Sequence, residues 1–414
     1  MTMIEMGKKA KESAYALSCF GTDGKNLILD KAAKALVANI PEILKANQKD
    51  VDLAIGKGVK ASLIDRLRLD EKRIEDMASG ILMVKELPDP IGEVISMNTL
   101  PNGLIVGKKR VPLGVIGIIF EARPNVAADA FALCFKAGNA VILRGGKEAI
   151  NSNMAIVGTI RKAIELEGLN ADVVQLVEDI SHETAKEMMK LNGYIDVLIP
   201  RGGAGLIKTV VENSTVPIIE TGTGNCHLYV DETADFKKAI DILINGKTQR
   251  TGVCNALESL LVNEKIADKF VPLAIAELNK YGVEIRGDKA FQKASSLVKE
   301  ATDEDYAAEF LDLIISAKVV ADTDEAISHI RKYSTGHSET IVTESYSNAQ
   351  KFLNNVDSAA VYVNASTRFT DGAQFGYGAE IGISTQKLHA RGPMGLKELT
   401  SYKYIIYGEG QIRE

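Results

Sequence analysis

The 414-residue chain lacks the features that mark several large classes of protein. It has no excess of basic residues, since its net charge is -6, and this argues against the electrostatic footprint of a nucleic-acid-binding protein. Its four cysteines never occur in Cys-x-x-Cys spacing, which argues against a disulfide framework and against a zinc site. We therefore expect neither a nucleic-acid partner nor a bound metal.

Long apolar segments are also missing. The longest apolar run, 111–120, is interrupted by glycines and is too short to cross a bilayer. Residues 1–11 carry several charged side chains and no apolar segment of the kind found in signal peptides. The sequence therefore predicts a cytoplasmic chain without membrane contact.

The composition does provide for a large core. Hydrophobic residues make up 46% of the chain and charged residues 25%, which excludes a disordered protein, and the length predicts two to three domains. Apolar positions at helical spacing predict helices across 1–87, most clearly at 30–40 and 73–86, with Pro41 opening a new helix.

A different pattern follows at 91–110. Alternating residues on both sides of Pro101-Asn102-Gly103 predict a β-hairpin, because Asn-Gly between such runs is the strongest short-range hairpin signal. Such a hairpin has edges to pair, so it is an oligomerisation candidate. A late strand at 401–407 is expected to join it.

An α/β pattern begins at 111. The apolar run 111–120 predicts a strand buried on both faces, and a helix at 125–137 with a strand at 140–144 completes a right-handed βαβ unit. Continued alternation predicts an α/β fold with a doubly wound, Rossmann-type nucleotide-binding sheet and a second α/β domain. The further predicted helices are 151–167, 182–191, 204–211, 265–280 and 323–333, and the strands are 173–177, 197–199, 217–220, 283–286, 313–320, 340–343 and 360–363.

Two loops at strand ends could hold a nucleotide, although no strand is followed by Gly-x-Gly-x-x-Gly. Gly202 and Gly203 follow one strand and open a helix, which suits either phosphate contact or a tight turn. Arg144 and Lys147 follow another strand. Cations there suit a 2′-phosphate and favour NADP over NAD, the alternative being a solvated surface lysine.

The stretch 246–256 contains the best nucleophile candidate, Cys254. A polar, glycine-punctuated loop ends at this cysteine, just before the apolar run 257–262, and Lys247 and Arg250 lie a few residues upstream. Nearby cations lower the pKa of a thiol, and the thiolate is the nucleophilic form. The alternative is an ordinary packed cysteine, which is how we interpret Cys19, Cys134 and Cys226.

Several segments together resemble the aldehyde dehydrogenase superfamily over nearly the whole chain. Pro-Leu-Gly-Val-Ile-Gly at 112–117 and Ala-Gly-Asn-Ala-Val-Ile-Leu at 137–143 are similar to its first cofactor strand–helix–strand. Glu-Thr-Gly-Thr-Gly at 220–224 is similar to its Glu-Leu-Gly-Gly segment, Cys254 falls where its nucleophile falls, and Glu-Phe-Leu at 309–311 is similar to its Glu-x-Phe segment.

Longer segments are similar to the branch of this superfamily that reduces γ-glutamyl phosphate. The branch signature is present at 320–341, and the stretches 120–126 and 220–227 also match. This resemblance implies an NADPH-dependent enzyme that converts L-glutamyl 5-phosphate to L-glutamate 5-semialdehyde through a cysteine thioester, in the second step of proline biosynthesis. It implies an NADPH-binding domain (1–93 and 111–222), a catalytic domain (223–398) and oligomerisation strands (94–110 and 399–414).

The resemblance also assigns roles to individual residues. It makes Cys254 the nucleophile and leaves Asn125, which matches by type, or Arg123, which matches by position, to support the oxyanion. Glu220 stands where hydrolytic relatives have their general base, and we expect it to act in positioning instead, since the reaction needs no water. The cofactor-binding candidates are Arg144, Lys147, Gly202, Gly203, Glu220 and Glu309. The candidates for binding an anionic substrate are Arg123, Arg250, His337, Arg368 and Arg391.

Other functions stay open at this point. A hydrolytic aldehyde dehydrogenase would use Glu220 as its base and need no phosphate, and a non-catalytic chain would keep the fold alone. The expected partners are the small-molecule substrate, further copies of the chain in a dimer or tetramer, and glutamate 5-kinase in transient contact.

Overall fold

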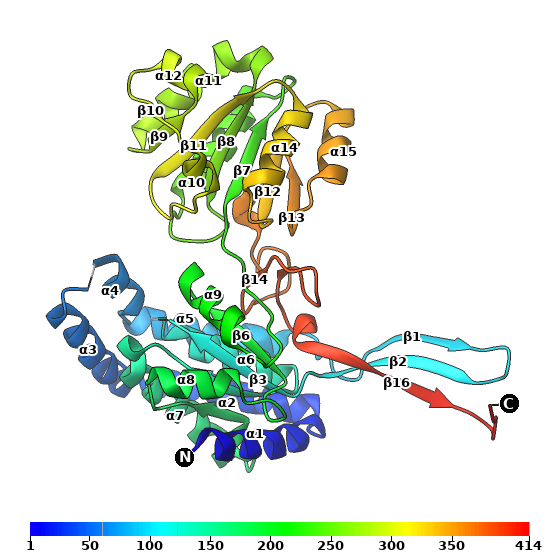
Figure 1. Cartoon of the computed structure of the whole chain (residues 1–414). Coiled ribbons are helices and arrows are strands. Elements are labelled where there is room, and N and C mark those ends of the chain that lie inside the picture. Colours follow the sequence, from blue (N-terminus) through cyan, green and yellow to red (C-terminus); the bar gives the residue numbers. More distant parts are fainter. Residues whose placement is uncertain (60, 122, 414) are drawn as a thin grey trace. The chain divides into compact units, whose positions relative to one another are not determined.

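The computed structural model describes residues 1–59, 61–121 and 123–413, and it divides into two compact units (Figure 1). Unit 1 comprises 1–221, 376–382 and 394–414, and unit 2 comprises 222–375 and 383–393. Parts of the segment predicted as catalytic, 376–382 and 394–398, therefore lie in unit 1. The units are described separately below.

The N-terminal helices of unit 1 confirm the predicted helical segment. Thr2 caps the first helix in a capping box with Glu5, and Pro41 lies in the first turn of the third. Asp70 caps the fifth helix by accepting a hydrogen bond from the backbone N–H of Arg73. The helices are α1 Met3–Ser18, α2 Thr22–Ala38, α3 Ile40–Gly56, α4 Ala61–Leu67 and α5 Glu71–Glu86.

A four-stranded parallel sheet, in the order β5-β4-β3-β6, forms the centre of unit 1. Every residue of β3 is buried, as expected for a central strand with helices on both faces. The strands are β3 Val115–Phe120, β4 Ala140–Arg144, β5 Val174–Leu176 and β6 Val197–Arg201. The helices are α6 Asn125–Lys136, α7 Ile150–Leu166, α8 His182–Met189 and α9 Ala204–Asn213.

Two predicted strands of unit 1 are wrong. The run 111–120 is not one strand, because the chain breaks at Gly114, whose φ of 124° lies in the region that favours glycine. Asp196 fixes this break by accepting a 2.7 Å hydrogen bond from the N–H of Val115. The segment 217–220 forms only a single bridge, between Ile218 and Leu198, in place of a strand.

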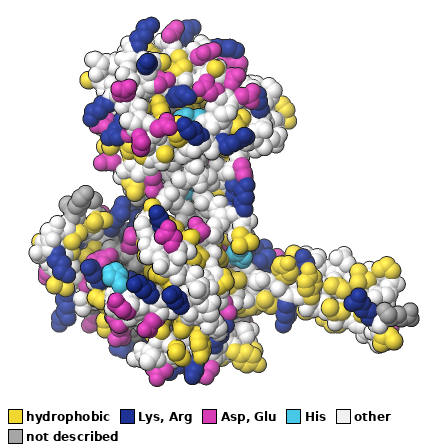
Figure 2. Space-filling model, viewed as in Figure 1, with side chains coloured by type: hydrophobic (Ala, Val, Ile, Leu, Met, Phe, Trp, Pro, Cys, Tyr) yellow, Lys and Arg dark blue, Asp and Glu magenta, His cyan; other side chains and the backbone are white. Residues whose placement is uncertain are grey.

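The predicted hairpin is confirmed, and the late strand joins it. β1 Val94–Thr99, β2 Ile105–Pro112 and β16 Thr400–Tyr407 form an antiparallel sheet in the order β1-β2-β16. Hydrophobic side chains are spread along this sheet (Figure 2), and Tyr402, Tyr404 and Ile406 are all exposed. Its apolar surface is therefore unusually open.

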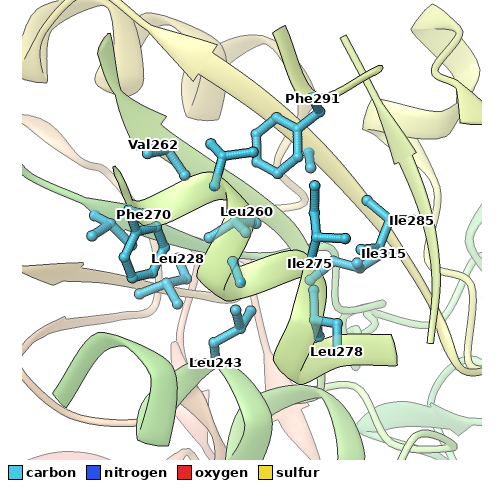
Figure 3. Packing of buried hydrophobic residues seen from close by; sticks show 14 of the residues in the cluster. Leu228, Leu243, Leu260, Val262, Phe270, Ile275, Leu278, Ile285, Phe291 and Ile315 are labelled. Carbon is cyan, nitrogen blue, oxygen red and sulfur yellow. The ribbon is translucent and has the colours of Figure 1, made fainter. Parts of the chain in front are cut away.

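Unit 2 contains a seven-stranded parallel sheet in the order β10-β9-β11-β8-β7-β12-β13. Its core packs α10 and α11 against the central strands, with Phe270 and Phe291 fully buried among leucines and isoleucines (Figure 3). The strands are β7 Cys226–Val230, β8 Leu257–Asn263, β9 Glu284–Gly287, β10 Lys299–Glu300, β11 Ile314–Val320, β12 Ser338–Val342 and β13 Ala360–Val363. The helices are α10 Phe236–Thr248, α11 Glu264–Lys280, α12 Lys289–Ala294, α13 Asp303–Ala307, α14 Thr323–Tyr333 and α15 Tyr346–Asn355. β14 Ile383–Ser384 and β15 Gly392–Pro393 form a separate pair.

Candidate active site

Cys254 lies in a tight turn between α10 and β8 of unit 2. Its side chain is partly exposed and forms no disulfide, and the turn is closed by a hydrogen bond from Ala256 N to Val253 O. The next residue, Asn255, donates its amide to the carbonyl of Thr370 at 2.9 Å and accepts from the hydroxyl of Thr367 at 2.9 Å. The backbone that carries the thiol is thus fixed to a second loop of the same unit.

The carbonyl group of Cys254 is enclosed by the segment that precedes β7. A Cβ at Gly224 would overlap this carbonyl oxygen, so only glycine allows the approach. The buried thiol of Cys226 donates to the same oxygen at 3.2 Å. Cys226 was predicted to be a packed cysteine; it is fully buried, but it also contacts the backbone of the predicted nucleophile. The same prediction is wrong for Cys19, which is exposed.

Arg368 interacts electrostatically with Cys254 and also with a second arginine, Arg250. Burial lowers the pKa of Arg368, neighbouring Arg250 lowers it further, and negative charge on Cys254 opposes that shift. Arg368 is half-buried and donates Nε to the side chain of Gln249 at 2.9 Å, whereas Arg250 is exposed. A cationic environment of this kind favours the thiolate and an anionic substrate.

Lys247 does not belong to this group, which corrects the sequence-based interpretation. The segment 246–248 forms the last turn of α10, and Lys247 is fully buried in an ion pair with Glu258 of β8, at 2.5 Å. Glu258 also accepts a 3.1 Å hydrogen bond from the N–H of Leu311, whose φ is 55°. Burial raises the pKa of Glu258 to about 7, although Lys247 opposes that shift, and burial also lowers the pKa of Lys247.

Glu309 contacts the loop that encloses the Cys254 carbonyl. Its Oε1 accepts a 2.7 Å hydrogen bond from the backbone N–H of Gly224, the residue packed on the Cys254 carbonyl. Glu309, the predicted cofactor ligand, and Cys254, the predicted nucleophile, therefore both contact Gly224.

The other two predicted substrate ligands of unit 2 have partners within the unit. His337 is fully buried, and its Nδ1 lies 2.8 Å from Ser338 Oγ and 3.8 Å from Cys226 Sγ. Arg391 donates Nη1 to the carboxylate of Asp357 at 2.8 Å and Nη2 to the carbonyl of the same residue at 2.7 Å. Their roles in substrate binding remain predictions.

The cofactor candidates of unit 1 lie at the carboxyl end of its sheet, where ligands of open α/β sheets bind. Arg144 ends β4 and donates Nη2 to the carbonyls of Ile180 and Ser181, while Lys147 is exposed just beyond it. Gly203 is the N-cap of α9, with Gly202 before it. Within unit 1 the N–H of Gly203 donates to the carboxylate of Glu121 at 3.1 Å.

Two buried polar groups lie close to the loop that follows β4. The buried side-chain amide of Asn153 and Nε of Arg144 have no hydrogen-bond partner among the described residues. A Cβ at Gly145 would overlap the Asn153 amide, so the loop rests directly on this polar group. Sequence reasoning missed Asn153, because its place in a helical segment does not show that its side chain lies beneath the loop at Gly145.

The candidate oxyanion residues follow β3. Asn125 begins α6, is exposed, and donates its amide to Asp129 one turn later at 2.9 Å. Burial raises the pKa of Asp129 to about 6. Arg123 and Glu220 are half-buried, and Ala122, part of the matched segment 120–126, lies outside the described residues.

The structure offers no sign of a metal centre in the part it describes. Across residues 1–59, 61–121 and 123–413, no group of three His, Cys, Asp or Glu side chains is arranged as metal ligands would be. No helix in the same residues combines the length and apolarity needed to cross a membrane.

Comparisons with known proteins agree with this architecture. The family model described as "Aldehyde dehydrogenase family" matches residues 5–308. A gamma-glutamyl phosphate reductase of Clostridium botulinum (strain Eklund 17B / Type B) is 62% identical over 99% of both chains, and one of Caldanaerobacter subterraneus is 60% identical over 98% of both.

Solved structures give the same result. The crystal structure of gamma-glutamyl phosphate reductase from Thermotoga maritima superimposes with a TM-score of 0.98, at 52% identity and with complete coverage of both chains. An acetylating aldehyde dehydrogenase from Geobacillus thermoglucosidasius shares the fold, with a TM-score of 0.71 at 18% identity. The chain therefore belongs to the aldehyde dehydrogenase family, in its branch of gamma-glutamyl phosphate reductases.

Proposed function

We propose that this chain reduces L-glutamyl 5-phosphate to L-glutamate 5-semialdehyde, releasing phosphate, with NADPH as the reductant and a thioester on Cys254 as the intermediate. The observation that carries the proposal is the Cys254 turn: its backbone is held by hydrogen bonds at Cys254 and at Asn255, while Cys254 itself stays partly exposed and interacts electrostatically with Arg368. The full-length similarity to gamma-glutamyl phosphate reductases supplies the substrate and the pathway, proline biosynthesis.

The chain's own groups account for the acyl-transfer half of the reaction. The Cys254 thiolate attacks the acyl carbonyl, a C–S bond forms, and the C–O bond to phosphate breaks, with phosphate taking the electron pair. Backbone N–H groups, with Asn125 or Arg123, are proposed to support the oxyanion. Arg250 and Arg368 supply positive charge for the thiolate and for the doubly anionic substrate.

The second half of the reaction regenerates the thiolate. A bound nicotinamide cofactor supplies the hydride that reduces the thioester. Cys254 then departs as the thiolate when the C–S bond breaks, and its cationic surroundings favour this form. No water is consumed, so Glu220 is proposed to help position the cofactor instead of acting as a base.

NADPH is proposed over NADH on the basis of Lys147. Its side chain is exposed just beyond the carboxyl end of β4, where it can meet a 2′-phosphate. Lys147→Glu should lower the preference for NADPH over NADH, measured as the ratio of kcat/KM values, by about 10-fold or more. Lys162→Glu on α7, also exposed, is the control and should leave the ratio unchanged.

The central experiment follows NADPH formation in the reverse direction. Purified protein receives glutamate 5-semialdehyde and NADP, with and without inorganic phosphate, as wild type, Cys254→Ala and, as a control, Cys19→Ala at an exposed cysteine. Turnover that needs both phosphate and Cys254 supports the proposal. Turnover without phosphate would indicate the hydrolytic reaction with Glu220 as base, and folded protein that binds NADPH without turnover would indicate a non-catalytic chain.

We also propose that copies of the chain associate through the β1-β2-β16 sheet. Tyr402, Tyr404 and Ile406 are exposed on one face of β16, with Lys108 over both tyrosine rings. An open apolar sheet of this kind is an association surface. Ile406→Asp should reduce the molar mass measured by light scattering to that of a smaller assembly, whereas Lys403→Asp on the opposite face should not. Contact with glutamate 5-kinase remains a prediction.

A further inference from the structure

Cys226 presents an unusual arrangement for a buried cysteine in unit 2. It begins β7, is fully buried, and its thiol donates to the carbonyl of Cys254 at 3.2 Å. Burial raises its pKa well above the ordinary value, and the negative charges of Glu339 and Cys254 add to that shift. The group therefore keeps its proton, which a hydrogen-bond donor requires.

The accepting carbonyl is tightly enclosed. Gly224 packs so closely on the carbonyl oxygen of Cys254 that no side chain is tolerated there. Loss of a hydrogen-bond donor to a carbonyl enclosed in this way costs free energy, so removal of the Cys226 thiol would favour rotation of the Cys254 peptide. Rotation of that peptide changes the direction in which the reactive side chain points.

Behind Cys226 a line of polar side chains continues through the unit. His337 Nδ1 lies 3.8 Å from the Cys226 sulfur and 2.8 Å from Ser338 Oγ. Ser338 Oγ lies 2.6 Å from Thr370 Oγ1, and the carbonyl of Thr370 accepts the Asn255 amide at 2.9 Å. These contacts therefore connect the carbonyl of Cys254, through Cys226, to the side chain of the next residue, Asn255.

We infer that Cys226 is a positioning residue, which holds the Cys254 peptide in the orientation that keeps the reactive thiol near Arg368. The inference rests on the proposed role of Cys254 as the nucleophile. Cys226 itself does not touch the substrate, since it is fully buried behind the turn. The closed line through His337, Ser338 and Thr370 keeps Cys226 in place.

The test measures Cys254 reactivity without any substrate. Iodoacetamide labels the protein at pH values from 6 to 10, and peptide mass spectrometry gives the rate of alkylation at Cys254. In Cys226→Ala the midpoint of this pH profile should move upward, because the thiolate leaves its cationic neighbours. The value of kcat should fall about 10-fold, as expected for one lost hydrogen bond, with little change in KM for NADPH.

Three further variants make the result decisive. Cys226→Ser keeps a hydroxyl donor and should restore both the midpoint and kcat, whereas Cys134→Ala, at a buried cysteine of α6, should change neither. Ser338→Ala interrupts the line behind Cys226 and should move the midpoint in the same direction, so it decides the matter if Cys226→Ala does not fold.

A wild-type midpoint in Cys226→Ala, or in Ser338→Ala when the first variant is unfolded, would overturn the inference. So would a shift of equal size in Cys226→Ser. Because the alkylation profile needs neither substrate nor cofactor, failure of this inference is distinguishable from failure of the proposed reaction, which would appear as absent turnover in the wild type.

Discussion

The buried pair of Lys247 and Glu258 allows a sharp prediction about stability. Both side chains are fully buried, and the carboxylate of Glu258 also accepts a hydrogen bond from the backbone N–H of Leu311. Lys247→Met should destabilise unit 2 by about 3–5 kcal/mol at pH 8, because it leaves a buried carboxylate without its cation. Removal of one member of a buried ion pair destabilises a protein far more than removal of both members.

Proton uptake sets a limit on this loss. A lone Glu258 can stay buried in its neutral form, which costs about 1.4 kcal/mol for each pH unit above the ordinary carboxyl pKa of 4.5. The limit is therefore about 5 kcal/mol at pH 8 and about 2 kcal/mol at pH 6. The loss should shrink as the pH falls, and Lys247→Met/Glu258→Gln, which keeps an acceptor for Leu311, should come within about 1 kcal/mol of the parent.

The absence of tryptophan from the chain provides the assay. Phe236→Trp places a single fluorophore in unit 2, beside the ring of Phe270, so that urea unfolding monitored by fluorescence reports on that unit alone. Lys265→Met is the control: its pair with Glu232 is largely exposed, and the loss should stay below about 1 kcal/mol. A loss below 1 kcal/mol for Lys247→Met, or a double variant no better than the single one, would refute the reasoning.

Three further predictions concern other described groups. Gly224→Ala should abolish turnover in folded protein, because the added Cβ meets the Cys254 carbonyl, whereas Gly158→Ala, in open space on α7, should leave turnover unchanged; steady-state kinetics and circular dichroism decide. Burial raises the pKa of Asp129 to about 6, so the folded state binds the proton of this carboxyl more tightly than the unfolded state and loses stability as the pH rises from about 4 to 6. Asp129→Asn should therefore stabilise unit 1 by about 1–2 kcal/mol at pH 8 but not at pH 4. Chemical denaturation at the two pH values measures this difference. Burial lowers the pKa of His329 to about 3, so the wild type loses stability as the pH falls below about 6.5. In the Phe236→Trp background, the free energy of unfolding of His329→Phe should fall by about 2 kcal/mol less than that of its parent between pH 7 and pH 5. Equal losses would contradict the assignment of this pH dependence to His329.

Local patterns in the sequence predicted those parts of the fold that depend on neighbouring residues. The helices of the first 87 residues, the hairpin around Asn102-Gly103 and the alternation of unit 1 are confirmed, because apolar periodicity and turn chemistry decide them. The run 111–120 was misread because its break at Gly114 is fixed by Asp196, a residue 82 positions downstream of it. No local pattern reveals a contact at such a distance.

In the candidate site, too, the sequence predicted features that depend on neighbouring residues and missed those that depend on distant contacts. Cys254 was predicted as the nucleophile from its glycine-punctuated loop and from the family resemblance, and this role stays a prediction. Lys247 was misplaced because α10 continues to Thr248 and turns this lysine toward Glu258 on the next strand. The hydrogen bond from Cys226 could not be predicted either, since it depends on how β7 and the end of α10 meet in three dimensions.

The order of the chain through the two units has a consequence for synthesis on the ribosome. Unit 1 is left at 221, re-entered at 376–382 and completed only by 394–414. One edge of β2 is covered by β16, which pairs Tyr407 with Ile105 and Thr400 with Pro112. Until residues 400–407 emerge, a nascent chain more than 390 residues long exposes that edge. During this interval the growing polypeptide is most open to wrong pairing with a neighbour, and the interval ends when β16 pairs with β2.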